Sequence, residues 1–259
     1  MRAGLISLLF PPKCPSCGAL LRFEGFGKEQ DVLCADCKKR WNSDLLDACG
    51  ICGNPVSTCE CMTEELQKAR IAGFRKRVYY IHGTRSATQN RILFKIKEGP
   101  AAGAIGFLAD ELQKSLTEML AKDGASKDPA VLCYFPRNRR SAAVSGTDQG
   151  KRLAEALSER TGIPVVRAIR RRRGKETEQK HLNSAQRRKN AKATYISDSH
   201  VSVKGKNVIL IDDIVTTGST MAAGARILRQ AGAERIYALS VAMDDTQKNG
   251  NLRQPTFRI

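Results

Sequence analysis

The stretch that decides the fold is residues 208–220, VILIDDIVTTGST. Its four leading apolar residues are typical of a strand that is buried on both faces of a parallel sheet. Asp212 and Asp213 follow where we expect that strand to end, and a loop of hydroxyl residues then leads into an apolar-periodic helix. Loop N–H groups and a helix N-terminus form an anion site. The two carboxylates cannot bind the same anion, so we expect them to hold sugar hydroxyls or a metal-bound ligand.

Strands and helices alternate along the rest of the chain, which predicts a doubly wound parallel sheet. We expect strands at 78–81, 130–135, 163–166 and 236–242, and helices at 87–97, 101–121, 148–161 and 219–231. Residues 63–77 are expected to form a polar, partly helical linker, and residues 167–192 a long loop with a helical part. The tail after residue 245 is expected to be poorly packed. Ligands of such sheets bind at the carboxyl ends of strands, where both residues 208–220 and residues 135–140 (FPRNRR) fall.

Eight of the nine cysteines lie between residues 14 and 61, in three Cys-x2-Cys pairs and one Cys-x-Cys pair. Two such pairs complete a tetrahedral four-thiolate zinc site, so we predict two Zn²⁺ ions with a structural role. Disulfides are disfavoured because we see no secretory signal. A redox role would explain one pair but not four, and Cys133 is expected in the core. The simplest pairing is sequential, although a cross-braced one stays open: Cys14, Cys17, Cys34 and Cys37; then Cys49, Cys52, Cys59 and Cys61.

Charge and hydropathy narrow the class of partner. The 259 residues carry a net charge of +18, and residues 167–192 hold eleven basic residues against two acidic ones. Such a block suits polyphosphate or nucleic acid, and the alternative is a solvated loop without a partner. No apolar run is long enough to cross a membrane, and residues 3–12 make a poor signal peptide. We therefore expect a cytoplasmic protein without membrane insertion.

Residues 208–220 resemble the PRPP-binding motif of type I phosphoribosyltransferases. The resemblance implies that Asp212 and Asp213 hold the ribose hydroxyls and that Mg²⁺ accompanies PRPP. It also implies that the following loop wraps the 5-phosphate, through Thr216, Thr217, Gly218, Ser219 and Thr220.

The whole chain resembles the ComF family, in which a double zinc ribbon precedes a phosphoribosyltransferase-like domain associated with DNA uptake. It implies a ribbon at 1–65, the second domain at 70–259, and other DNA-uptake proteins as candidate partners. Gln179, Leu182, Arg187 and Asn190 keep the spacing of a family segment, and Lys95 or Lys97 would supply a family lysine. The chain departs from the family pattern at residues 133–136 and 145–150. Positive charge persists in the expected pyrophosphate loop, on Arg137, Arg139 and Arg140.

Three functions stay open at this point. The first is a PRPP-binding protein that handles single-stranded DNA, and the second is an active phosphoribosyltransferase in nucleotide or related metabolism. The third is a PRPP sensor that docks a protein partner. One set of residues would serve either as a nucleic-acid surface or as a lid over PRPP: Arg170, Arg171, Arg172, Arg173, Gln179, Arg187, Arg188, Lys189 and Asn190.

Overall fold

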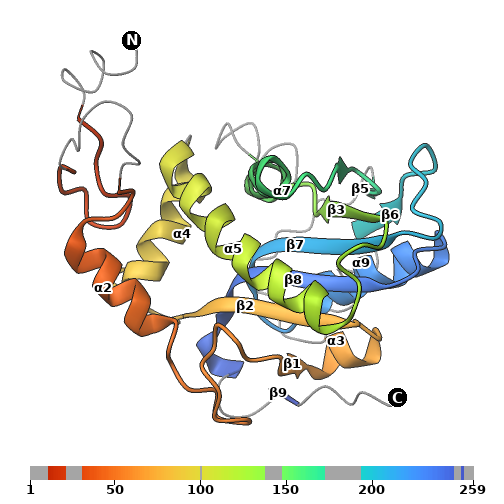
Figure 1. Ribbon diagram of the computed structural model, residues 1–259, viewed down its shortest axis with the longest axis horizontal. Coiled ribbons are helices and arrows are strands. Elements are labelled where there is room, and N and C mark those ends of the chain that lie inside the picture. Colours follow the sequence, from red (N-terminus) through yellow and green to blue (C-terminus); the bar gives the residue numbers. More distant parts are fainter. Residues whose placement is uncertain are drawn as a thin grey trace.

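A five-stranded sheet organises the chain in the computed structural model, and all of its strands are parallel (Figure 1). The structure describes residues 11–21, 31–99, 101–137, 148–172, 194–247 and 252–253. The strand order is β2-β8-β7-β3-β4. The predicted parallel α/β fold class is confirmed. The strands are β2 (Gly73–Tyr80), β8 (Ile236–Asp244), β7 (Asn207–Val215), β3 (Ala130–Tyr134) and β4 (Val165–Val166).

Helices cover both faces of this sheet, which explains why its strands are continuous apolar runs. Helices α5 (Ala102–Lys122) and α7 (Gln149–Thr161) pack on one face, and α9 (Ser219–Gln230) packs on the other beside α3 (Glu64–Lys68). Along β7, Ile209 and Ile211 belong to the apolar core under α5 and α7, whereas Val208 and Leu210 belong to the core under α9. Side chains of a strand alternate between faces, and the four apolar residues at 208–211 are all buried.

Helix α2 (Ala35–Asp44) joins the cysteine-rich segment to the sheet domain. It contacts α4 (Thr88–Glu98), and its buried Trp41 packs edge-to-face on Phe107 of α5. Trp41 Nε1 also donates to Glu111 Oε2, and the Arg77 guanidinium lies 2.8 Å from the same oxygen. A single buried carboxylate therefore connects α2, α5 and β2.

The expected linker at 63–77 is wrong in its second half. Strand β1 (Met62–Thr63) and α3 occupy its start, but β2 begins at Gly73 and carries three consecutive basic residues in its interior. Arg75, Lys76 and Arg77 are all buried, and Lys76 is fully so. Sequence polarity suggested exposure, yet each cation meets an acidic or carbonyl partner in the fold, which removes the cost of burying it.

Three other expectations are corrected. Strand β7 does not end before the two acids but continues to Val215, because β8 also continues and pairs with it, as in Asp212 with Ser240. The expected loop at 167–192 begins instead with β5 (Ile169–Arg171), which pairs antiparallel with β6 (Tyr195–Ser197). Residues 173–193 lie outside the described part. The tail is packed in part, since β9 (Leu252–Arg253) pairs with β1. Among the described residues, no helix has the length and apolar character needed to span a membrane.

Candidate functional site

A small cradle lies at the carboxyl end of β7, where the chain turns into α9. It encloses about 250 Å³ and is lined by Asp212, Ile214 and residues 215–221. Gly218 has φ +78°, the left-handed conformation that glycine adopts at little cost, and this turn starts the helix. The hydroxyl oxygens of Thr217 and Ser219 lie 2.8 Å apart at its rim. Hydroxyls and the first N–H groups of α9 therefore face one small cavity, which suits a phosphate-sized anion.

The back of this cradle rests on the end of the cysteine-rich segment. A Cβ on Gly218 would come within 2.5 Å of Thr63 Oγ1 and 2.9 Å of Leu66 Cγ. Thr63 caps α3, because its hydroxyl accepts a hydrogen bond from the Leu66 N–H. Only a glycine at position 218 therefore allows the loop to approach α3 this closely.

The two acids are held differently although they are adjacent. Asp213 Oδ2 lies 3.0 Å from Lys97 Nζ at the end of α4, whereas Asp212 Oδ1 accepts the backbone N–H of Asp213. Burial and the neighbouring Asp213 charge raise the pKa of Asp212 well above its ordinary value. Burial alone would raise the pKa of Asp213 too, but the Lys97 ammonium outweighs it and the pKa lies below the ordinary value. A hydroxyl donor or a cation bound in the cavity would therefore stabilise the charged form of Asp212 more than that of Asp213.

Arg137 follows β3 on the same edge of the sheet. Its backbone N–H donates to Asp148 Oδ2 at 3.2 Å, and Asp148 also caps α7 by accepting the Lys151 N–H. The expected pyrophosphate-loop residues Arg139 and Arg140 lie outside the described residues. Only the first position of that expected set can therefore be placed.

The start of the basic segment packs beside an aromatic pair. The rings of Phe135 and Tyr195 meet edge-to-face at 5.4 Å, and the Arg171 guanidinium lies 5.8 Å from the Tyr195 ring centre. Burial raises the pKa of Tyr195 to about 12. Arg170 donates to the carbonyl of Ser197, and the Arg172 N–H donates to that of Thr194. The remaining expected members lie outside the described residues: Arg173, Gln179, Arg187, Arg188, Lys189 and Asn190.

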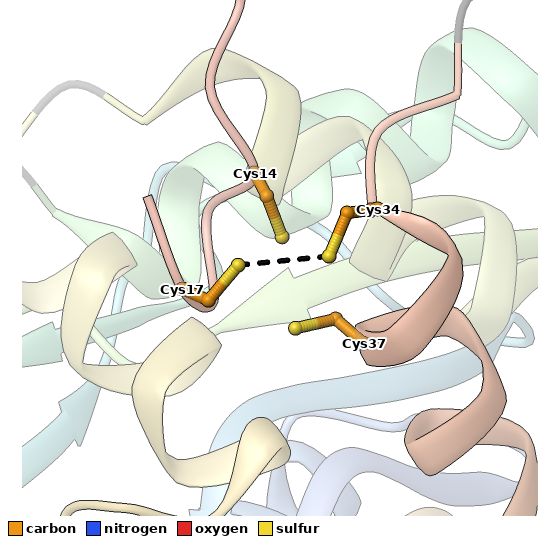
Figure 2. Close-up of side chains that lie close together, drawn as sticks. All are labelled: Cys14, Cys17, Cys34 and Cys37. Atoms are coloured by element: carbon orange, nitrogen blue, oxygen red, sulfur yellow. Dashed lines mark hydrogen bonds between the residues drawn. The ribbon is translucent and has the colours of Figure 1, made fainter. Parts of the chain in front are cut away.

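Eight cysteines form two groups of four, and in each group the sulfur atoms lie within 4.8 Å of one another. Figure 2 shows the first group pointing inward, from the turn before Gly18 and from the start of α2. Within it, the sulfurs of Cys17 and Cys34 lie 3.6 Å apart. Zn–S bonds of about 2.3 Å in a tetrahedron place sulfurs about 3.8 Å apart, so the spacing fits zinc. The grouping is sequential: Cys14, Cys17, Cys34 and Cys37, then Cys49, Cys52, Cys59 and Cys61.

The second group has a buried cation beside it. Lys76 Nζ lies 3.1 Å from Cys59 Sγ and 2.9 Å from the carbonyl oxygen of Cys61. Four thiolates around Zn²⁺ carry a net charge of −2, which this ammonium would partly neutralise. Sequence reasoning placed Lys76 in a polar, partly helical linker. The basic triplet is flanked by the aromatic Phe74 and the β-branched Val78, two residue types that favour strands. This signal could have placed Lys76 in a strand.

Comparison with known proteins agrees with both parts of this architecture. Residues 144–258 match the phosphoribosyl transferase domain and residues 5–69 match the double zinc ribbon domain. The chain is 24% identical over 211 residues to "Competence protein ComFC" of Bacillus subtilis, covering 79% of this chain and 81% of that protein. It is 32% identical over 127 residues to adenine phosphoribosyltransferase of Mycobacteroides abscessus, covering 48% of this chain and 70% of that enzyme. A purine phosphoribosyltransferase structure from Pyrococcus horikoshii matches 53% of this chain and 74% of its own, with 21% identity and a TM-score of 0.34.

A parallel sheet with an acid pair and a hydroxyl loop at its carboxyl edge, together with these matches, defines a phosphoribosyltransferase-domain protein. Its ribbon carries two cysteine groups arranged for metal. The chain carries a double zinc ribbon ahead of that domain and is similar to relatives named for competence, as its resemblance to the ComF family implies.

Proposed function

We propose that this protein binds PRPP in the cradle after β7 and couples that binding to the handling of single-stranded DNA in DNA uptake. The observation that carries the PRPP assignment is the cavity that Asp212 lines together with a hydroxyl-rich helix N-terminus, with Asp213 next to Asp212 in the chain. Asp212 and Asp213 would accept hydrogen bonds from the ribose hydroxyls, and residues 216–220 would donate to the 5-phosphate. Anion and sugar would then occupy opposite ends of one pocket, as a phosphorylated ribose requires.

Mg²⁺ suits the same pocket. Carboxylate and hydroxyl oxygens are hard ligands of the kind that Mg²⁺ prefers. Asp212 and the Thr216 and Thr217 hydroxyls would hold it or its water ligands. The ion would supply positive charge against pyrophosphate. Lys97 already keeps Asp213 ionised, so the protein itself orients one carboxylate for a hydroxyl donor.

The DNA part of the proposal rests on charge and on relatives. The net charge is +18 and half of that excess falls in residues 167–192. The described start of this segment places Arg171 against Tyr195, a cation beside an aromatic ring. Phosphate neutralisation by such a segment is tolerant of sequence and sensitive to salt. A relative bears the name of a competence protein. DNA-uptake partners and a cytoplasmic location belong to the same proposal.

The second candidate is an active phosphoribosyltransferase. It is favoured by the adenine phosphoribosyltransferase relative and by Arg137 at the carboxyl end of β3, beside the site where pyrophosphate would lie. Arg139 and Arg140 would join it there, and basic residues would stabilise the departing pyrophosphate. Among the described residues of the site, none identifies an acceptor, which is why this candidate ranks second.

Calorimetric titration with PRPP-Mg²⁺ tests the common core of both candidates. Asp212→Asn with Asp213→Asn removes two charge-assisted hydrogen-bond acceptors, each worth about 1.5–3 kcal/mol, so affinity should fall at least about tenfold. The control is Glu118→Gln, an exposed acid on α5. Unchanged PRPP binding in the double variant would refute the assignment. Parallel titration with single-stranded DNA at two salt concentrations separates the first candidate from the second.

A further inference from the structure

A second and larger cavity lies between the first cysteine group and α4. It has a volume of about 690 Å³, within the usual range of small-molecule sites. The knuckle at residues 12–18 forms one wall, α4 forms another, and the start of α5 closes a third. Ser16 Oγ donates to the Thr88 carbonyl and ties the first two walls together. The cavity is therefore built jointly by the ribbon and the sheet domain.

One wall offers a flat aromatic surface. Phe94 is half-buried on α4, and the Arg85 guanidinium lies 4.7 Å from its ring centre. Tyr80 holds the ring from the side, edge-to-face at 6.3 Å. An arginine plane and a fixed phenyl ring that both line one cavity form a stacking platform, the arrangement that receives nucleobases.

The same wall supplies positive charge. Arg91 and Lys95 line the cavity beside Phe94, and Lys13 lies on the opposite wall. Arg91 Nε is buried from solvent and has no hydrogen-bond partner among the described residues, so a donor is left unsatisfied there. Of the two acids in the lining, Asp31 is already paired with Lys38 at 2.7 Å, and Glu98 is the other. The lining carries four basic residues against these two acids, so it would attract an anionic ligand.

We propose that this cavity binds a nucleotide, with its base stacked on Phe94 and Arg85 and its phosphate held by Arg91 and Lys95. The nucleotide would come from a single strand or be free in solution. The choice of a strand as the source rests on the proposed function, whereas the site itself does not. Lys97, which directly precedes the cavity residue Glu98 on α4, holds Asp213, so α4 serves both sites. The zinc ribbon thus acquires a role as one wall of a binding site.

The test uses the zinc-loaded full chain and an oligothymidylate of about 20 nucleotides, followed by fluorescence anisotropy at low salt. Phe94→Leu keeps apolar packing but removes the aromatic face, and it should weaken binding by about tenfold, while Phe94→Tyr should bind as the parent does. Arg91→Met and Lys95→Met should each flatten the log–log salt dependence by about 0.7. The matched control is Lys204→Met, an exposed lysine in the loop before β7, at the amino edge of the sheet.

Binding that survives unchanged in Phe94→Leu, Arg91→Met and Lys95→Met would overturn the proposal. Equal losses in Phe94→Tyr and Phe94→Leu would overturn the stacking arrangement as well. Calorimetry with thymidine monophosphate distinguishes the sources: saturable binding that Phe94→Leu weakens indicates a free nucleotide, and binding of the oligonucleotide alone indicates a strand.

Failure here is distinguishable from failure of the proposed function. PRPP titration of the cavity variants should match the parent, because none of them lines the cradle. A parent that binds the oligonucleotide through Phe94 but does not bind PRPP would refute the proposed function and leave this site standing. A parent that binds PRPP but neither nucleotide probe would refute this site and leave the PRPP assignment standing.

Discussion

Replacing Gly218 by alanine tests whether the phosphate cradle is supported by the end of the ribbon. Gly218 has φ +78°, and an alanine in that conformation costs about 1–2 kcal/mol. The added Cβ would also lie 2.5 Å from Thr63 Oγ1 and 2.9 Å from Leu66 Cγ. Such overpacking costs about 1–3 kcal/mol more. We expect Gly218→Ala to lower the free energy of unfolding by about 2–5 kcal/mol in total.

Gly205→Ala is the matched control. Gly205 also has a left-handed φ of +68°, but no described atom lies within 4 Å of the added Cβ. It should lose only the conformational part, about 1–2 kcal/mol. The assay is urea unfolding of zinc-saturated protein, followed by the fluorescence of Trp41, the single tryptophan. Equal losses of stability in the two variants would refute the argument that α3 supports the loop. PRPP affinity should fall only in Gly218→Ala.

Further predictions concern the metals, the acid pair and a core thiol. Elemental analysis after gel filtration should find about two zinc ions per chain, and a value near zero in reduced, unchelated protein would contradict the two cysteine groups. Asp212 has a raised pKa in the folded state, so its contribution to stability is greatest below pH 3.8 and is lost as the pH rises through the folded-state pKa. At neutral pH the buried charge is unfavourable, and Asp212→Asn should therefore raise the urea midpoint. Lys97→Met should lower the urea midpoint at neutral pH. Lys97 lowers the pKa of Asp213, and the stabilisation that this gives is present above pH 3.8 and disappears on acidification. A midpoint that moves the same way in both variants would contradict this account. Cys133 is fully buried and burial raises its pKa to about 12, so it should resist a thiol reagent at pH 8 until urea unfolds the chain; rapid labelling of the native protein would refute this.

The central motif was predictable because its information is local. An apolar run, two acids, a hydroxyl loop and a periodic helix follow one another within 13 residues, and each dictates its own conformation. The apolar stripe of α5 was equally readable, and Leu108, Leu112 and Leu116 are all buried. Cysteine spacing likewise pointed to two metal sites. The grouping now seen is the sequential one.

Features that depend on distant partners were not predictable. Lys76 is buried because Cys59 and Cys61 lie beside it, and neither contact can be read from the polarity of residues 75–77. Likewise, β5 pairs with Tyr195–Ser197, which lies more than 20 residues further along the chain. The local sequence around β5 does not indicate this partner. The cavity beside Phe94 has walls contributed by residues more than 70 positions apart. The division at 1–65 and 70–259 stays a prediction.

The basic triplet of β2 decides how the two halves of the chain can be recombined. Among the described strands, β2 lies at the edge of the sheet and pairs with β8 alone, and two of its cations have their partners in residues 58–61. Cutting the gene before β1 would leave Arg75 without Glu60 and Lys76 without its carbonyl and sulfur partners, although both side chains are buried. Grafting a foreign ribbon would fail for the same reason unless it supplied an acid and a carbonyl at those places. The two halves should therefore be expressed and engineered together.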